Sequence, residues 1–207
     1  MAPADLHGLL VIDKPGLALN APPEPGLRLP TSHDIVQRVR RLSGQRRIGH
    51  TGTLDPMASG VLVLCLGVAT RLVEYYQGHD KTYRAEVTLG AATDTYDALG
   101  AVIARHPLPA LDVEQIEAAL DHFRGEILQR PPIYSALKQG GESLHRKARR
   151  GEAVQVQPRR VTIHRLELLA FLPPDRVRLE IVCSAGVYVR SLAHDLGERL
   201  GVGGHLS

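Results

Sequence analysis

The chain has 207 residues, of which 43% are hydrophobic and 23% are charged, and its formal net charge is +3. This composition is typical of a globular protein with one substantial core and a mildly basic balance. No apolar stretch reaches the roughly 20 residues that a membrane-spanning helix needs, and no signal-peptide pattern opens the chain, so we expect a cytoplasmic protein with no membrane association. Cys65 and Cys183 lie in apolar runs without metal-type spacing, which favours buried free thiols over a disulfide.

The first expected elements are a strand and a helix with a loop between them. Residues 9–12 form an apolar run typical of a short buried strand, whereas residues 17–30 are rich in proline and glycine, which predicts a surface loop. Thr31 or Ser32 can cap a helix that ends near Gly44. The apolar positions with helical spacing in that helix are Ile35, Val36, Val39 and Leu42.

A glycine-rich loop with a single acid, Asp55, spans residues 49–60 and leads directly into the apolar run 61–66. The run is bounded by glycines, which predicts a buried strand. Because Pro56 fixes φ immediately after the acid, we expect Asp55 on a stiff loop at a sheet edge, where proteins commonly carry catalytic groups. The alternative is that Asp55 closes an Asx-turn, and the local pattern alone favours this reading because Asp-Pro turns are common.

Further along the chain, residues 83–89 alternate as a strand does. Asp112 begins a second helix in which Gln115 is placed as the reciprocal capping partner and Gly125 is the expected stop. The apolar stripe of that helix consists of Ile116, Ala119, Leu120 and Phe123.

The last third of the chain predicts a β-hairpin and a closing helix. Residues 161–172 and 176–184 alternate, and the turn 173–175 joins them. Residues 190–200 have helical periodicity. Because several strands follow one another without a helix between them, the pattern favours an α+β fold with a mixed, largely antiparallel sheet flanked by helices.

Basic residues are clustered rather than spread evenly. Such clusters suit a polyanion, because each neutralised phosphate releases condensed counterions, although a solvated helix face is the alternative for any single cluster. The clusters consist of Arg38, Arg40, Arg41, Arg46 and Arg47, then Lys138, His145, Arg146, Lys147, Arg149 and Arg150, and finally Arg159 and Arg160.

Residues 49–60 resemble the signature Gly-His-x-Gly-x-Leu-Asp-Pro-x-Ala-x-Gly of the TruB family of tRNA pseudouridine-55 synthases. Segments 10–16, 80–84, 93–100 and 183–197 are similar to other family motifs in the same order and spacing. The resemblance implies a pseudouridine synthase catalytic domain over residues 8–207. It also implies isomerisation of uridine to pseudouridine at position 55 in the T-arm loop of tRNA, by base flipping and without a metal or cofactor.

The resemblance implies that Asp55 is the catalytic residue and that Arg190 pairs with it. Breaking a glycosidic bond calls for an ionised carboxylate, and a cation partner keeps it ionised. Tyr83 matches the family tyrosine that stacks on the target uracil and assists proton removal from C5.

Further residues are expected in substrate binding rather than in chemistry. Tyr188 matches a tyrosine that lines the same pocket, and His50 matches a histidine that holds displaced loop bases. Lys14 belongs to the Lys-Pro turn and is expected to be structural or to face a phosphate. Asp94 and Asp97 are expected to cap turns, since their spacing is not that of a calcium loop. The expected contacts to the RNA backbone are Arg46, Arg47, Lys138, Arg146 and Lys147.

The chain also departs from the family pattern. Residues 17–30 form an insertion, and residues 131–153 correspond to an arm that grips the RNA stem-loop. The chain stops before the Leu-Arg-Arg segment and the C-terminal PUA-type domain of most members, so we expect a truncated product. We also expect a monomer. On this view the residues after the last helix form a turn with no following strand, and Val202 and Leu206 are exposed.

Two other classes of function compete with this reading. A glycosidase or nucleosidase normally needs two cooperating carboxylates, and the signature loop offers one. A catalytically inactive, truncated RNA-binding module requires only the basic clusters. A P-loop enzyme is excluded because no Gly-x-x-x-x-Gly-Lys-Ser/Thr motif is present.

Overall fold

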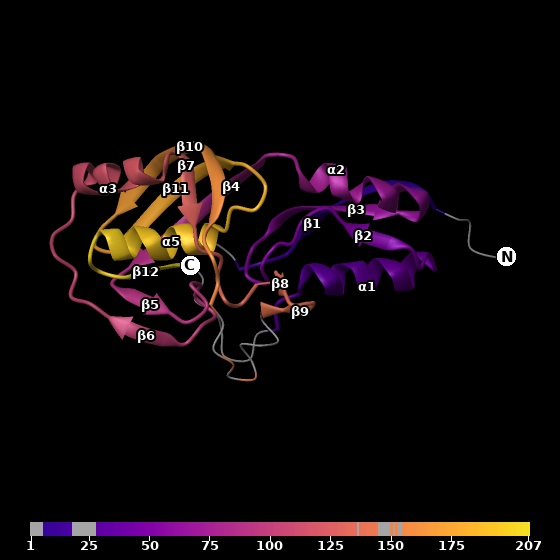
Figure 1. Cartoon of the computed structure of the whole chain (residues 1–207), viewed down its shortest axis with the longest axis horizontal. Coiled ribbons are helices and arrows are strands. Elements are labelled where there is room, and N and C mark those ends of the chain that lie inside the picture. Colours follow the sequence, from indigo (N-terminus) through magenta and orange to yellow (C-terminus); the bar gives the residue numbers. More distant parts are fainter. Residues whose placement is uncertain (1–5, 18–27, 136, 145–149, 151, 153–154) are drawn as a thin grey trace. The chain divides into compact units, whose positions relative to one another are not determined.

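The computed structural model describes residues 6–17, 28–135, 137–144, 150, 152 and 155–207. The chain divides into two compact units, Met1–His79 and Asp80–Ser207. Strands lie in both units (Figure 1). Each unit also has its own hydrophobic core. The α+β class expected from the sequence is confirmed, and the pairings between named strands in the described residues are antiparallel.

The first unit contains a three-stranded sheet in the order β1-β3-β2, and helix α1 packs on one face of it. A short helical stretch follows the sheet. The bounds are β1 (Gly8–Lys14), α1 (Ser32–Ser43), β2 (Ile48–His50), β3 (Gly60–Leu66), η1 (Gly67–Leu72) and α2 (Val73–Gln77).

Helix α1 begins and ends as its sequence predicts. Thr31 is the N-cap, and its hydroxyl accepts a hydrogen bond from the Asp34 amide while the Asp34 carboxylate accepts one from the Thr31 amide at 3.0 Å. Gly44 ends the helix in the left-handed conformation with φ of 69°. The apolar stripe is shorter than expected, because Leu42 is exposed and only the residues up to Val39 pack on the sheet.

The expectation of fully buried strands is wrong for one face of this sheet. Leu10 and Ile12 pack on the core beneath α1, but the side chains between them point the other way. Val11 is 63% exposed and Val61 is 70% exposed. An apolar run therefore marks the strand correctly without showing which of its faces is covered.

The second unit contains a five-stranded antiparallel sheet in the order β12-β4-β11-β10-β7. Two smaller sheets, β5-β6 and β8-β9, accompany it. The bounds are β4 (Lys81–Leu89), β5 (Ala91–Thr93), β6 (Val102–Arg105), α3 (Val113–Leu120), η2 (Asp121–Phe123), β7 (Gly125–Gln129), β8 (Lys138–Gln139), β9 (Glu142–Ser143), β10 (Arg159–Leu172), β11 (Arg176–Cys183), α5 (Val189–Arg199) and β12 (Gly204–Leu206).

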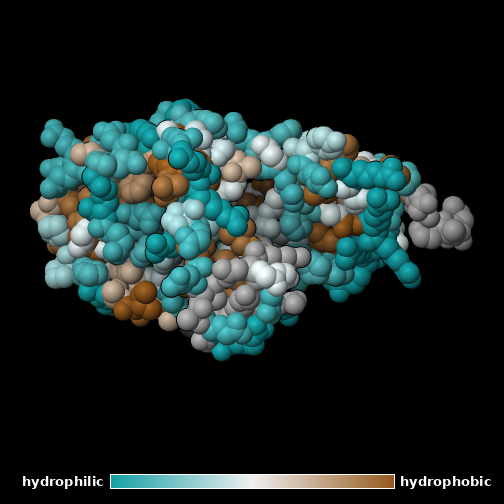
Figure 2. Space-filling view, viewed as in Figure 1, coloured by the Kyte–Doolittle hydropathy of each residue, from teal (hydrophilic) through white to brown (hydrophobic). Residues whose placement is uncertain are grey.

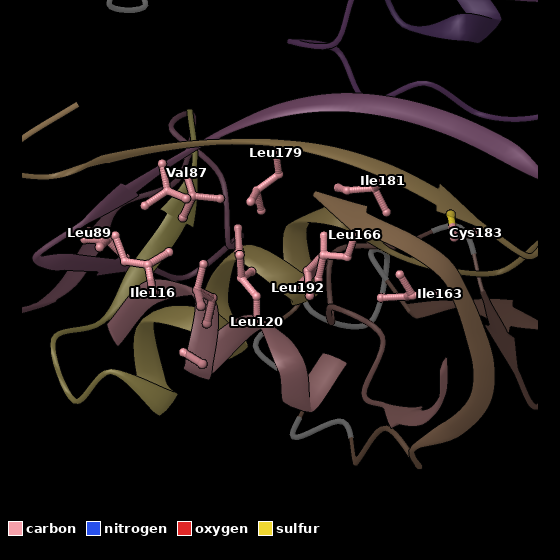
Figure 3. Close-up of a cluster of buried hydrophobic side chains, with 14 of the residues drawn as sticks. Val87, Leu89, Ile116, Leu120, Ile163, Leu166, Leu179, Ile181, Cys183 and Leu192 are labelled. Atoms are coloured by element: carbon pink, nitrogen blue, oxygen red, sulfur yellow. The ribbon is translucent and has the colours of Figure 1, made fainter. Parts of the chain in front are cut away.

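Helices α3 and α5 bury one face of this sheet. Figure 3 shows Leu179 and Ile181 of β11 pointing from the sheet toward Leu120 of α3 and Leu192 of α5. The capping box of Asp112 and Gln115, the β10–β11 hairpin and the closing helix are confirmed. On the outer surface, a brown patch over β6 marks exposed apolar side chains of that strand (Figure 2).

The expectation that no strand follows the last helix is wrong. Strand β12 pairs with β4, Val202 is 3% exposed, and Leu206 is partly buried against the main core. The chain can turn back because Gly197 of α5 has no side chain. The Val202 and Gly203 amides donate to the Gly197 carbonyl at 3.0 Å, and a Cβ at Gly197 would clash with the backbone of Gly203 and Gly204.

We therefore expect Gly197→Ala to destabilise the protein although alanine is the better helix former. Overpacking against the β12 backbone should lower the free energy of unfolding by about 1–3 kcal/mol, measured by urea denaturation. Glu198→Ala, at the neighbouring exposed helix position, is the matched control. Equal stability of the two variants would show that the α5–β12 contact relaxes easily.

Candidate active site

Asp55 begins a tight turn that connects β2 to β3. The Ala58 amide donates to the Asp55 carbonyl at 3.0 Å, and Pro56 occupies the second position of the turn, where its fixed φ is favourable. The main-chain carbonyl of Asp55 thus closes this turn, and the Asp55 side chain is half-buried.

Lys14 holds the Asp55 turn from the end of β1. Its side chain is 0% exposed, and its ammonium group donates to the carbonyls of Ala58 at 2.7 Å, Pro56 at 3.0 Å and Pro15 at 3.0 Å. A buried ammonium group is tolerated only when its hydrogens are bonded, and these three acceptors meet that need. Of the two roles expected for Lys14, its burial supports the structural one.

Gly16 lets the chain after Lys14 lie directly against the turn. A Cβ there would clash with the backbone of Met57, Ala58 and Ser59. The Leu17 amide donates to the Met57 carbonyl at 2.8 Å. Gly16 lies in the motif-like segment 10–16, but the sequence does not show why glycine is needed there, because the requirement comes from a segment about 40 residues further along the chain.

Ser32 fixes the residue before Asp55. Its hydroxyl, 2% exposed, donates to the Leu54 carbonyl at 3.1 Å and accepts from the Leu54 amide at 3.0 Å. Ser32 was one of two candidate caps for α1, and Thr31 takes that role. Asp55 is therefore held from both sides: Ser32 binds Leu54, and Lys14 binds Pro56 and Ala58.

The electrostatics of the first unit are set by burial. Burial lowers the pKa of Lys14, and the negative charge of Asp55 raises that pKa, which partly offsets the effect. Burial also lowers the pKa of His50, opposed by the Gly52 carbonyl, so this imidazole is neutral at pH 7. His50 ends β2, opposite Leu64 of β3.

In the second unit, Arg190 lies at the start of α5 and is 5% exposed. Its guanidinium donates to the carbonyls of Thr95 at 3.0 Å and Tyr134 at 3.1 Å. The Asp97 carboxylate is 3.6 Å away. A cation is unfavourable at a helix N-terminus, and these oxygen partners offset that cost.

Asp97 has a second role besides the expected turn cap. One carboxylate oxygen accepts from the Thr95 hydroxyl at 2.7 Å and from the Leu99 amide at 3.0 Å, as a capping residue does. The other lies toward Arg190. Asp94 caps the same loop, since it accepts from the Ala101 amide at 2.8 Å.

Gln129, which the sequence pattern does not single out, fixes Tyr188. Its buried amide accepts from the Tyr188 amide at 2.8 Å and donates to the Tyr188 carbonyl at 3.0 Å. Tyr188 is thereby held at the N-cap of α5. Tyr83 lies on β4 opposite Ile181 and is half-buried.

The expected site residues thus fall in both units: Asp55, His50 and Lys14 in the first, and Tyr83, Tyr188 and Arg190 in the second. Their convergence on one cleft stays a prediction.

The expected RNA-backbone residues are only partly described. Arg46 is exposed, and Arg47 donates to the Thr70 hydroxyl at 2.7 Å. Lys138 lies in β8, whereas Arg146 and Lys147 lie outside the described residues, as do most of the expected insertion 17–30 and parts of the expected arm 131–153.

The described part of the chain contains no cluster of three or more His, Cys, Asp or Glu side chains suited to a metal ion. Nor does it contain a helix both long and apolar enough to cross a membrane. A cavity of about 460 Å³ lies in the second unit, and none of the expected site residues lines it. Its polar lining includes Thr88, Arg105, His106, Asp175 and His205.

The fold is shared with a solved chain from the crystal structure of a Cbf5-Nop10-Gar1 complex, with a TM-score of 0.70 and 29% identity over 97% of this chain and 46% of that one. Residues 40–189 match the family model of the TruB family pseudouridylate synthase, N terminal domain. The chain therefore belongs to the TruB family, which confirms the resemblance of its motifs.

Two curated relatives illustrate the similarity. The tRNA pseudouridine synthase B of Symbiobacterium thermophilum is 50% identical over 100% of this chain and 66% of the relative. That of Heliobacterium modesticaldum is 45% identical over 100% of this chain and 64% of the relative. The chain thus spans somewhat less than two thirds of the length of these relatives.

We expect Lys14→Met to loosen the Asp55 turn, because the carbonyls of Pro15, Pro56 and Ala58 would lose their donor. The free energy of unfolding should fall by about 3 kcal/mol or more, measured by urea denaturation. Arg41→Met, which removes an exposed cation from α1, is the matched control and should cost under about 0.5 kcal/mol. Similar losses in both variants would contradict the proposed hold on the turn.

Asp195 of α5 makes stability depend on pH. Burial raises its pKa from 3.8 to about 6, Arg130 opposes the shift and Glu198 adds to it. Since the folded pKa is the higher one, the favourable contribution is present while the carboxyl is protonated and is lost as the pH rises through about 6.

Asp195→Asn should therefore stabilise the protein by roughly 1 kcal/mol near pH 7.5, discounted for the solvent that reaches this side chain, and have little effect near pH 4. Urea denaturation at both pH values measures this. A constant difference across pH would point to packing rather than ionisation.

Proposed function

We propose that this chain isomerises uridine to pseudouridine at position 55 in the T-arm loop of tRNA, acting as a monomer in the cytoplasm. Membership of the TruB family supports the proposal, as do the names of its relatives. The observation that carries it is the turn in which Lys14 and Ser32 fix the residues on both sides of Asp55. A carboxylate held in this way is preorganised for chemistry at one defined point.

The reaction breaks the bond between N1 of the base and C1′ of the ribose and forms a bond between C5 and C1′. One proton leaves C5, and N1 gains one, so no net oxidation occurs and the chemistry itself needs no redox cofactor. We assign the carbon–nitrogen bond cleavage to Asp55. Tyr83 stacks on the flipped uracil and assists removal of the C5 proton, and Arg190 keeps the carboxylate ionised.

The remaining residues act in binding. His50, neutral because of its burial, holds the displaced loop bases, and Tyr188 lines the base pocket. Arg46, Arg47, Lys138, Arg146 and Lys147 neutralise phosphates of the stem. Such contacts make affinity fall steeply with salt.

Asp55→Asn should abolish turnover but leave tRNA binding intact, because asparagine has the same shape as aspartate and lacks its negative charge. We expect release of tritium from C5-tritiated tRNA to fall by about 10⁴-fold or more, with tRNA affinity within about tenfold of wild type. A T-arm hairpin should serve as substrate, and the same hairpin with cytidine at the target position should not.

Asp13→Asn, an exposed aspartate in the same unit, is the matched control. Release of free uracil by the wild-type chain would indicate a nucleosidase. Binding without tritium release by the wild-type chain would indicate a non-catalytic RNA-binding module, and substantial turnover by Asp55→Asn would remove Asp55 from the catalytic role.

A further inference from the structure

Two neighbours of Tyr96 contact the buried guanidinium of Arg190. The Thr95 carbonyl accepts a hydrogen bond from it at 3.0 Å, and the Asp97 carboxylate lies 3.6 Å from it. The loop between β5 and β6 thus places oxygen atoms on Arg190 from the residues immediately before and after Tyr96. Whatever fixes Tyr96 also fixes these two oxygen partners.

Tyr96 has an unfavourable backbone conformation. Its φ is 64°, and among the described residues it is the one non-glycine residue with positive φ. This left-handed region suits glycine, which has no Cβ, and to a lesser degree asparagine, but it is unfavourable for a bulky residue such as tyrosine. A tyrosine persists there only if its surroundings stabilise it.

The Tyr96 side chain is stabilised by stacking of its ring on the imidazole of His194. The two rings lie 3.9 Å apart between centroids, with an angle of 7° between their planes. The Nδ1 atom of His194 is buried and makes no hydrogen bond with any residue that the structure describes. Burial lowers the pKa of His194, so a neutral imidazole faces the tyrosine ring.

His194 follows Arg190 by four residues on α5, so both side chains lie on the same face of that helix, one turn apart. The stack therefore fastens the loop to the helix that carries Arg190. The loop is also held by main-chain bonds, since the Leu206 amide donates to the Tyr96 carbonyl at 3.0 Å and the Ala98 amide to the Leu206 carbonyl at 2.8 Å. Because of these bonds, the loop should still fold without the tyrosine ring.

We propose that Tyr96 is a positioning residue: its stack on His194 holds Thr95 and Asp97 in contact with Arg190, and thereby sets the orientation of the guanidinium. The inference rests on the proposed function, in which Arg190 acts in catalysis. It assigns Tyr96 no contact with the substrate. Loss of the ring should therefore slow the chemical step and leave tRNA affinity unchanged.

The test compares Tyr96→Asn with Tyr96→Phe. Asparagine tolerates positive φ, so it removes the ring without adding backbone strain, and phenylalanine keeps the ring without the hydroxyl. We expect the single-turnover rate constant at saturating tRNA to fall about tenfold in Tyr96→Asn, with the dissociation constant within about twofold, and Tyr96→Phe to restore most of the rate. Tyr75→Asn, an exposed tyrosine of α2, is the matched control.

His194→Ala should reproduce the Tyr96→Asn effect, and the double variant should be no slower than either single one, because both remove the same stack. The signal of the Arg190 Nε–H group in ¹H–¹⁵N NMR spectra, assigned with Arg190→Lys, gives a readout that does not depend on activity. It should broaden in Tyr96→Asn and stay sharp in Tyr96→Phe.

Three results would overturn the proposal: an unchanged rate in Tyr96→Asn, equal losses in the asparagine and phenylalanine variants, or a loss of tRNA affinity in place of rate. An inactive wild-type chain would instead overturn the proposed function. In that case the NMR comparison still decides whether Tyr96 orders Arg190, since an unaltered Arg190 signal in Tyr96→Asn would refute the positioning role.

Discussion

The ammonium group of Lys14 and the carbonyls of the Asp55 turn depend on each other. A buried cation is unstable without acceptors, and inward-pointing carbonyls are unstable without a donor. The contacts with Pro56 and Ala58 satisfy both requirements at once. These hydrogen bonds fix the position of the Asp55 backbone, because the turn cannot shift without leaving the ammonium group and the carbonyls unpaired.

Close approach between backbone segments is the second constraint, and it recurs in both units. Gly16 lets the Lys-Pro turn lie against residues 57–59, and Gly197 lets β12 lie against α5. Main-chain hydrogen bonds form at both contacts. The Leu17 amide donates to the Met57 carbonyl in the first unit, and the Val202 and Gly203 amides donate to the Gly197 carbonyl in the second. Such sites tolerate no added atom, since protein interiors have few voids that could absorb one.

Local patterns predicted the elements well, and contacts between distant segments explain what they missed. The capping box of Asp112 and Gln115 lies within four residues, so the start of α3 could be predicted from the sequence alone. Which face of β1 is covered depends on where α1 docks, and the partners of Arg190 are 56 and 95 residues away in sequence. No periodicity contains that information. The motif indicated Asp55 as a candidate catalytic residue. Only the structure shows that Ser32 fixes the neighbouring residue, Leu54, by a hydrogen bond.

The proposed chemistry depends most on two charged residues, Asp55 and Arg190, and main-chain groups restrict the position of both. The segment of Asp55 is fixed through its backbone, and Arg190 is fixed through main-chain carbonyls that accept from its guanidinium. Main-chain groups are stiffer than long side chains, so the backbone of Asp55 and the guanidinium of Arg190 need little further ordering when a substrate binds. Charges that are already oriented stabilise a transition state more effectively than charges that must reorganise. The cost of burying them falls instead on folding, and the hydrophobic core of each unit offsets it.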